Sequence, residues 1–409
     1  MALSTLSVIA FRDLGRNRRR SILTMVAVAL GLALLIALNG LTAGVLEDSL
    51  QNSIRLQTGH LQIRNASYQK EKLSLQWKDL LAEPEALAGR ANTMPEVKAA
   101  TPVLWAGGML NAANESAGVQ IYGIDPTSPV FAPIREALVA GQFLTPDDRA
   151  GILIGKRLAD SLDIGVDQRV TLSLVDGDGR PQEGVFTIRG VFYTGVASYD
   201  ESAAFMPLAK AQAFSGAGDR ASAIVILLKQ QNDADKVAAA LRAPGNVTLT
   251  WRTLNALFLE TMQSAMGFYV LFDLIVILVV AVVIANTLLM AVFERVREVG
   301  ILAALGMKRR QVMLLFLLEA AILGLAGIVL GMAIGLAGVA YLARVGIYIG
   351  EDIAATAGNI AISTIMYARF VPGAFLSLAV GTLGVIVLAA LYPAWFAARL
   401  EPVRALHAQ

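Results

Sequence analysis

The chain contains no cysteine and only two histidines, His60 and His407, which lie far apart in the sequence. Without cysteine there is no disulfide framework, no thiolate metal site and no thiol available for acylation. The two separated histidines do not supply a metal-binding cluster either. We therefore expect neither a metal site nor thiol chemistry, and the search for function turns to other residues.

Charged residues are also scarce, at 16%, whereas hydrophobic residues make up 56% and the mean hydropathy is +0.60. This composition is typical of a membrane protein. The first apolar run, Ile22 to Ala43, has 22 residues without a charge, and as a helix it reaches about 33 Å, enough for a bilayer core. It is too long for the apolar part of a secretory signal, so we expect a retained anchor. We predict four transmembrane helices, at residues 21–44, 267–293, 312–343 and 371–398.

The basic residues cluster beside the ends of these runs. Arginines precede the first run, bases separate the second from the third, and Arg399 and Arg404 follow the fourth. The positive-inside rule assigns such clusters to the cytoplasm. We therefore expect both termini to be cytoplasmic, with 1–20, 294–311 and 399–409 inside and with 45–266 and 344–370 outside.

The predicted outer domain, 45–266, has the alternating pattern of short strands. Examples are "GHLQIRN", "GVQIYGID", "RVTLSLV" and "SAIVILLK", and "VDGDGRPQEG" is a turn signal. Two helices are expected, at Lys156 to Leu162 and Asp233 to Leu241, and apolar residues at helical spacing extend spans one and two outward as stalks. The predicted fold is therefore a four-helix membrane protein with a large extracytoplasmic α+β domain between helices 1 and 2.

No motif for covalent catalysis is complete. Gly155-Lys156 lacks the spacing and the hydroxyl residue of a phosphate loop, and Asp176 to Gly179 lacks the later ligands of a calcium loop. No serine has a histidine base beside it. We expect no catalytic residues on this chain.

The predicted spans contain regularly spaced small residues and a few polar residues. Small residues at spacings of three and four form a helix-packing face in span three and a similar one in span four; the glycines are Gly324, Gly327, Gly331, Gly335, Gly338 and Gly381. Polar residues within the spans are few: Asp273, Asn286 and Glu319. Such residues face a bundle interior or a cavity, although Asp273 and Glu319 lie near enough to the span ends to reach the headgroups instead.

A short charged stretch, "ERVREVGILAALGMKRRQV" from Glu294 to Val312, separates spans two and three. Its apolar and charged residues are spaced as in an amphipathic helix, and Gly306 is expected to end that helix before the bases that anchor span three. One interpretation is an ordinary positive-inside loop. The other is a helix held between two spans that docks into the groove of a partner.

The sequence resembles the FtsX/MacB superfamily of ABC transporter permeases in four stretches. These are "AFRDLGRNRRRSILTMVAVALG", "GILIGKRLADSLDIGVDQRVTLSL", "NTLLMAVFERVREVGILAALGMKRRQV" and "LYPAWFAARLEPVRAL". The resemblance implies that Leu3 to Leu14 is a membrane-surface helix. It also implies that a coupling helix docks on a cytoplasmic ABC ATPase dimer, through Glu294, Arg297, Glu298, Gly300, Leu302, Leu305 and Gly306. ATP and magnesium are then bound by that separate partner. When the ATPase dimer closes, the membrane helices transmit its motion to the outer domains, a mechanism called mechanotransmission.

Within the superfamily, the chain most resembles the lipoprotein-releasing LolC/LolE branch. That resemblance implies a bacterial inner-membrane permease, paired with an identical or paralogous permease, that extracts lipoproteins for a periplasmic carrier. Acyl chains would then contact residues of spans one and two: Val26, Leu30, Leu34, Leu274 and Leu278. Two alternatives stay open, namely export of amphiphilic molecules with a periplasmic adaptor, and signalling to a periplasmic hydrolase without transport. The expected partners include the lipid bilayer but no nucleic acid.

Overall fold

The computed structural model describes residues 8–10, 12, 18–67, 73–112, 115–356 and 361–399. The surface helix predicted over Leu3 to Leu14 lies outside the described residues except at 8–10 and 12, and the predicted tail lies outside them after Arg399. The chain divides into two compact units. Unit 1 holds Met1–Val45, Met262–Ile347 and Met366–Gln409, and unit 2 holds Leu46–Thr261 and Tyr348–Ile365.

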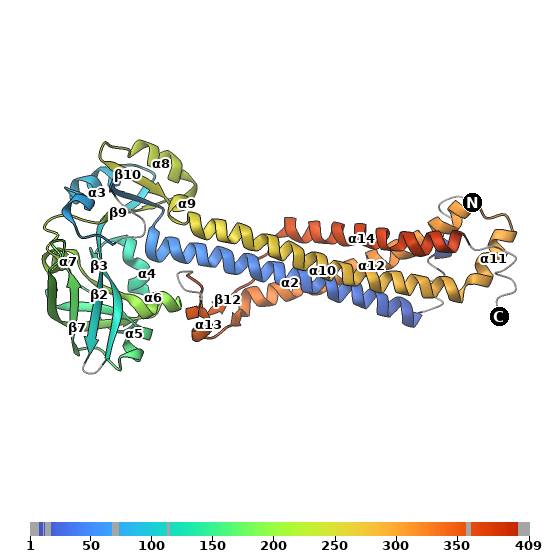
Figure 1. The fold of residues 1–409 in the computed structure, drawn as a ribbon, viewed down its shortest axis with the longest axis horizontal. Helices are drawn as coiled ribbons and strands as arrows, with labels where there is room; N and C mark the ends of the chain where they lie inside the picture. The colour runs from blue at the N-terminus through green and yellow to red at the C-terminus, as the bar shows by residue number, and fades with distance from the viewer. Residues whose placement is uncertain are drawn as a thin grey trace. The chain divides into compact units, whose positions relative to one another are not determined.

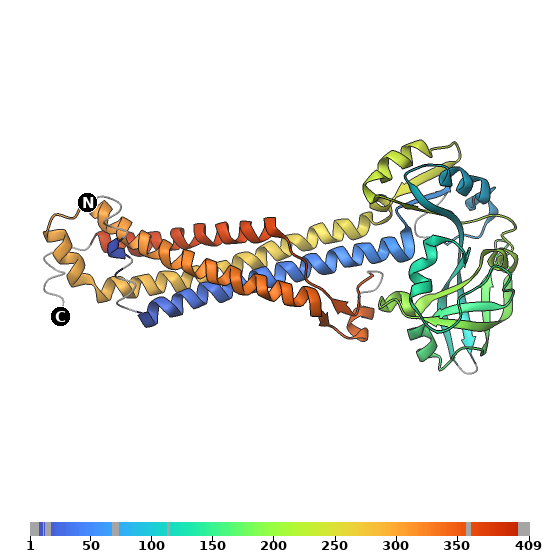
Figure 2. The same cartoon turned by 180° about the vertical axis from the view of Figure 1, so that it is seen from behind.

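Unit 1 is a bundle of long helices that lie side by side in both views (Figures 1 and 2). Four helices are long and apolar enough to cross a membrane. They correspond to the four predicted spans, and a short helix connects the second to the third. Their bounds are α2 Arg18–Ser53, α10 Ala256–Glu294, α11 Val296–Ala304, α12 Arg309–Val345 and α14 Pro372–Ala398. α2 and α10 continue past the predicted spans into unit 2, as the predicted stalks require.

Glycines of α12 bring its backbone close to α2. A Cβ atom added at Gly331 would lie 2.7 Å from the carbonyl oxygen of Ala29, and those at Gly327 and Gly335 would lie within 3.0 Å of Val28 and Ile36. Gly324 faces α14 instead, with Ile386 at 2.9 Å. The α12 backbone thus lies close to α2 at Gly327, Gly331 and Gly335, and close to α14 at Gly324.

The further positions of the predicted packing face have no neighbour among the described residues. A Cβ atom at Gly338 or Gly381 meets nothing within 4 Å, and the same holds for Gly373 and Gly384 in α14. The reason is geometric: regular spacing places glycines on one face, but a neighbour must be present along the whole of that face. Span four therefore packs through larger side chains, including Phe375 and Ile386, which are buried.

The glycine contacts predict a difference between two matched variants. Gly331→Val places a branched side chain against the α2 backbone, whereas Gly338→Val adds the same side chain in open space. We expect the first to destabilise unit 1 by about 1–3 kcal/mol relative to the second, because close-packed interiors tolerate added volume poorly. Thermal unfolding of the detergent-solubilised chain measures this, and equal melting temperatures would contradict the assigned packing.

Unit 2 contains a ten-stranded sheet that divides into two parts at one long strand, β2. The residues of β2 from Val97 to Val103 pair with β9, and those from Leu104 to Ala112 pair with β3. The strands are β1 Leu61–Asn65, β2 Val97–Ala112, β3 Glu115–Ile124, β4 Leu138–Gly141, β5 Gly151–Gly155, β6 Arg169–Val175, β7 Pro181–Phe192, β8 Ala203–Pro207, β9 Ala223–Leu228 and β10 Asn246–Thr250. The long strand is therefore shared by two lobes.

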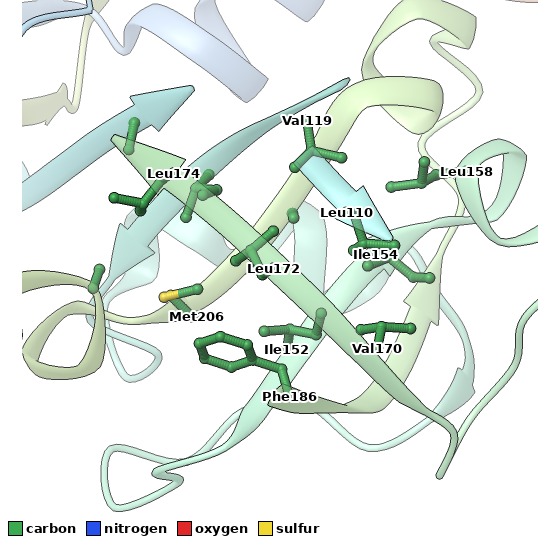
Figure 3. Close-up of a cluster of buried hydrophobic side chains, with 14 of the residues drawn as sticks. Leu110, Val119, Ile152, Ile154, Leu158, Val170, Leu172, Leu174, Phe186 and Met206 are labelled. Carbon is green, nitrogen blue, oxygen red and sulfur yellow. The ribbon is translucent and has the colours of Figure 1, made fainter. Parts of the chain in front are cut away.

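One lobe is a closed ring of six strands. The pairings run β2-β3-β8-β5-β7-β6 and return to β2, since β6 pairs with both β7 and β2. Figure 3 shows the side chains that fill this ring, among them Leu110, Ile152, Leu172 and Phe186, all almost completely buried. Closure leaves few exposed strand edges, because the backbone groups of each strand find partners on both sides.

The other lobe is the open sheet β10-β1-β9 continued by the first half of β2. Residues of helices α3 and α8 pack against it in a separate apolar cluster that includes Ala91, Ile226 and Val237. The helical elements of unit 2 are η1 Ile54–Thr58, η2 Trp77–Asp79, α3 Pro84–Asn92, η3 Pro129–Phe131, α4 Ala132–Glu136, α5 Lys156–Ser161, α6 Ala197–Ser202, α7 Leu208–Ser215, η4 Gln231–Asp233, α8 Ala234–Ala240 and α9 Trp251–Leu254.

The predicted α+β character is confirmed, and so are the helices near Lys156 and Asp233, as α5 and α8. The expectation of only two helices is wrong, because α3, α4, α6 and α7 also form. These helices are five to nine residues long. So few turns give little periodic signal in the sequence.

The segment that connects α12 to α14 belongs to unit 2 from Tyr348 to Ile365. It contains β11 Ile347–Tyr348, α13 Glu351–Thr356 and β12 Ile365–Met366. Arg157 binds Glu351 at 3.0 Å, the backbone N–H of Thr364 donates to the carbonyl of Gly195 at 3.1 Å, and Asn52 donates to Ser363 Oγ at 2.9 Å. The predicted outer loop is thus attached to the outer domain by side-chain and backbone bonds, a detail that the sequence did not indicate.

Asp200 lies beside this attachment and is fully buried. Burial raises the pKa of Asp200 to about 6, the charge of Glu351 acts in the same direction, and hydrogen bonds from Thr194 and Gly195 oppose both. A raised pKa in the folded state means that protonation stabilises the fold. This contribution is fully present below the ordinary pKa near 4 and is lost as the pH rises through 6.

We therefore expect unit 2 to become more stable as the pH falls from 7.5 to 5, by on the order of 1 kcal/mol from this carboxyl group. The measurement is the unfolding temperature of the full chain at the two pH values. The Asp200→Asn variant should show a smaller pH dependence than the wild type. If the stability of the variant depends on pH as strongly as that of the wild type, other titratable groups cause the dependence.

Candidate functional site

The short helix α11 lies at the end of the bundle, between the end of α10 and the start of α12 (Figure 1). It spans Val296–Ala304, within the stretch from Glu294 to Gly306 where the docking residues were expected. Glu294 is the last residue of α10, and Gly306 has a φ of +94°. This backbone conformation favours glycine, and it turns the chain after the helix as predicted.

The two faces of α11 differ in burial. Val299 and Gly300 are buried and Leu302 is half-buried, whereas Arg297 and Leu305 are exposed. Ile301 is also exposed, and it lies midway between Arg297 and Leu305 on one helical face, at intervals of four residues. Leu305 is 80% exposed. α11 and Leu305, the residue after it, therefore present a face of one cation and two apolar side chains.

Ion pairs surround the start of α11. Arg20 in α2 binds Glu294 at 2.7 Å. Arg295, in the link between α10 and α11, binds Glu298 at 3.1 Å and Glu319 in α12 at 3.4 Å. Arg295 thus links Glu298 of α11 to Glu319 of α12, and the pair of Arg20 with Glu294 joins α2 to α10.

Glu298 was predicted to contact a partner, but in this chain it pairs with Arg295. The predicted docking residues therefore separate into two groups. Arg297 and Leu305 are exposed, whereas Glu294 and Glu298 form ion pairs with Arg20 and Arg295.

The polar residues within the spans have three different environments. Glu319 is 2% exposed and paired with Arg295, so the alternative that it reaches the headgroups is wrong. Asp273 accepts hydrogen bonds from the side-chain amide of Asn39 at 3.1 and 3.2 Å. Asn286 is exposed and has no hydrogen-bond partner among the described residues. Glu319 and Asp273 therefore hold helices together.

The apolar residues that were predicted to contact substrate are all exposed. Val26, Leu30 and Leu34 recur every four residues along α2, and Leu274 and Leu278 do so along α10. α10 is the least covered of the four spans: 6% of its most apolar stretch is buried, compared with 50% for α12. Unit 1 therefore has a large apolar surface on α10 that the described residues do not cover.

Sequence reasoning missed Ile301 and Arg295. The signal for Ile301 was available, since the spacing of Arg297, Ile301 and Leu305 marks one face of a helix. Arg295 gave a weaker signal, because the position of Glu298 three residues later does not reveal the contact with Glu319. That contact depends on how α10 and α12 lie side by side (Figure 2).

Two protein families match the chain. The family described as MacB-like periplasmic core domain matches residues 21–243, and the family described as FtsX-like permease C-terminal matches residues 270–402. Together with four span-length helices and the α+β unit, these matches define a membrane permease of the ABC transporter class. The chain belongs to the FtsX/MacB superfamily of ABC transporter permeases.

Relatives in several branches of the superfamily are similar to the chain. The lipoprotein-releasing system transmembrane protein LolC of Neisseria meningitidis is 26% identical over 78% of this chain and 79% of its own length. The uncharacterized ABC transporter permease YknZ of Bacillus subtilis is 26% identical over 95% of both chains. The macrolide export ATP-binding/permease protein MacB of Sodalis glossinidius is 24% identical over 98% of this chain and 60% of its own length.

Proposed function

We propose that this permease works with an ABC ATPase dimer on separate chains, which bind the ATP and magnesium. In the bacterial inner membrane, the positive-inside rule places both termini and α11 in the cytoplasm and unit 2 in the periplasm. α11 offers the exposed face of Arg297, Ile301 and Leu305 to the ATPase. This face supports a docking role, because a short amphipathic helix with apolar anchors fits a groove.

The proposed substrate is a lipoprotein, extracted from the outer leaflet of the inner membrane and passed to a periplasmic carrier. The observation that carries this proposal is the exposed apolar surface of α2 and α10, which includes Leu30, Leu34, Leu274 and Leu278. Acyl chains gain about 0.8 kcal/mol for each methylene that moves out of water, so a route out of the bilayer must keep them on apolar surface. The similarity to LolC supports the same assignment.

ATP-driven motion would reach the periplasm through the helices themselves. α2 and α10 each continue past the bilayer length, and Arg295 joins the start of α11 to α12. Movement of α11 by the ATPase would therefore move the helices directly. A second permease, identical or paralogous, would cover part of the exposed surface of α10 and complete the substrate site.

The test is reconstitution of the permease in liposomes with the ATPase encoded beside it. A fluorescent diacylated lipoprotein is placed in the membrane, and its release to a periplasmic carrier is measured after ATP addition. Release that depends on ATP is the expected result. Leu34→Asp should reduce release, and the exposed Leu325→Asp in α12 is the control for a charge elsewhere on the apolar surface.

The second candidate is export of amphiphilic small molecules or peptides with a periplasmic adaptor. It is favoured by the similarity to MacB, which extends over 98% of this chain. Under this alternative, no lipoprotein leaves the liposome, and ATP hydrolysis rises when an adaptor and an amphiphilic compound are added. The same experiment therefore separates the two functions.

A further inference from the structure

Unit 2 contains a cavity of about 530 Å³ at the point where α2 ends. Its walls come from the end of α2, the turn η1, strand β3, helices α6 and α9, and the first turns of α10. Its volume lies in the range of sites for small ligands and short peptides, about 300–1,000 Å³. None of its lining residues is charged.

Two primary amides in the lining are available for a ligand. The side chains of Gln57 and Gln120 make no hydrogen bond to another described residue, whereas other polar groups of the lining are already paired. Ser53 donates to Asn255 at 2.6 Å, and the Tyr199 hydroxyl donates to the carbonyl of Leu56 at 2.8 Å. Each glutamine amide has two N–H donors and one carbonyl acceptor, so the pair offers both kinds of bond at one site.

Another part of the lining is apolar. It consists of Leu254, Leu257 and Phe258, and Leu257 is 68% exposed. A ligand that fits both parts of the lining has neutral hydrogen-bonding groups as well as small apolar groups. A charged ligand fits poorly, because its charge would lose water without gaining a counter-ion.

The local backbone places Gln57 in the cavity. The five residues Ile54–Thr58 form a π-helix, closed by the N–H of Gly59 donating to the carbonyl of Ile54 at 2.8 Å. Turns of this kind are rare and occur frequently at functional sites. Here the π-helix follows α2 directly and ends at the left-handed Gly59, so it forms the part of the wall that holds Gln57 and Thr58.

We propose that this cavity binds an uncharged stretch of peptide chain that follows the acylated residue of the substrate. The inference rests on the proposed lipoprotein function and names a second subsite for it. An extended backbone supplies alternating N–H and C=O groups to Gln57 and Gln120. Its small side chains contact Leu254, Leu257 and Phe258. The acyl chains stay on the apolar surface of the spans.

The test is photo-crosslinking in the complete complex in lipid nanodiscs. A photoreactive phenylalanine replaces Leu257, and the probe is a synthetic peptide of small neutral residues with a diacylglyceryl group on its first residue. Mass spectrometry should locate the crosslink in the peptide. The matched control is the same photoreactive residue at Val185, an exposed apolar position of β7, which should give only background.

Substitution of Gln57 gives the second measurement. Gln57→Glu should lower the crosslink yield at least about tenfold, because the added charge is desolvated when the peptide binds. Gln57→Asn keeps the amide and should retain most of the yield. Equal crosslink yields for the wild type, Gln57→Glu and Gln57→Asn would overturn the subsite, and so would a crosslink to lipid without peptide.

Release assays distinguish this result from the function itself. If ATP releases the diacylated probe but the crosslink at Leu257 is absent, the subsite is wrong and the lipoprotein function stands. If ATP never releases the probe, the lipoprotein function fails and the subsite fails with it.

Discussion

Leu305→Asp is expected to separate the permease from its ATPase while leaving it folded in the membrane. Leu305 directly follows α11 and is 80% exposed, so the change removes no internal packing of the chain. A leucine buried in a partner's groove contributes about 1.5–3 kcal/mol, and burying a carboxylate there adds a further cost. We expect a loss of at least about 2 kcal/mol, or about thirtyfold in Kd.

The measurement is co-purification of the ATPase and its binding to the purified permease. Arg297→Glu and Ile301→Asp lie on the same exposed face and should act in the same direction. Val185→Asp is the matched control, since it places the same charge at an exposed apolar position of unit 2. Normal ATPase binding by all three α11 variants would exclude this face as the docking surface.

Arg295→Met is expected to destabilise unit 1 strongly, because Glu319 in α12 loses its guanidinium partner at a buried position. Removal of one member of a buried ion pair costs about 3–5 kcal/mol. Replacing both members with apolar residues is often neutral, so Arg295→Met with Glu319→Leu should recover most of the lost stability. Arg20→Met breaks the more exposed pair with Glu294 and should cost no more than about 1 kcal/mol.

Thermal unfolding in detergent measures these differences, and ATP-dependent release measures their effect on coupling. The double variant is the informative one, since it folds without the bond between the start of α11 and α12. We expect it to bind the ATPase but to release less substrate per ATP hydrolysed. A double variant as unstable as Arg295→Met alone would show that the two side chains do not act as a pair.

The sequence was most informative about the membrane spans, for a physical reason. A span needs about 20 apolar residues in one continuous run, and such a run is visible without knowledge of its neighbours. The charged stretch between spans two and three was equally visible, as was the role of Gly306 in ending the helix. Contacts between helices were not visible, and Glu319 shows why: its environment depends on Arg295, 24 residues away.

In unit 2 the strands could be predicted, but their pairing could not. Alternation marks each strand, whereas closure of the ring depends on β6 pairing with both β2 and β7. The attachment of the segment after α12 was likewise hidden, because Arg157 and Glu351 lie 194 residues apart. The predicted packing face of α12 is an intermediate case. The spacing of its glycines was visible in the sequence, but the absence of a neighbour at Gly338 among the described residues was not.

The unequal packing of the spans has a consequence for variation among homologous chains. Gly327, Gly331 and Gly335 face the backbone and side chains of α2 at distances that exclude a larger residue, so these sites should rarely vary. The outward positions of α10, such as Val270 and Leu278, need only remain apolar and should exchange freely among aliphatic residues. Closely related permeases with different cargoes should therefore diverge along α10 while the junction of α2 with α12 stays the same.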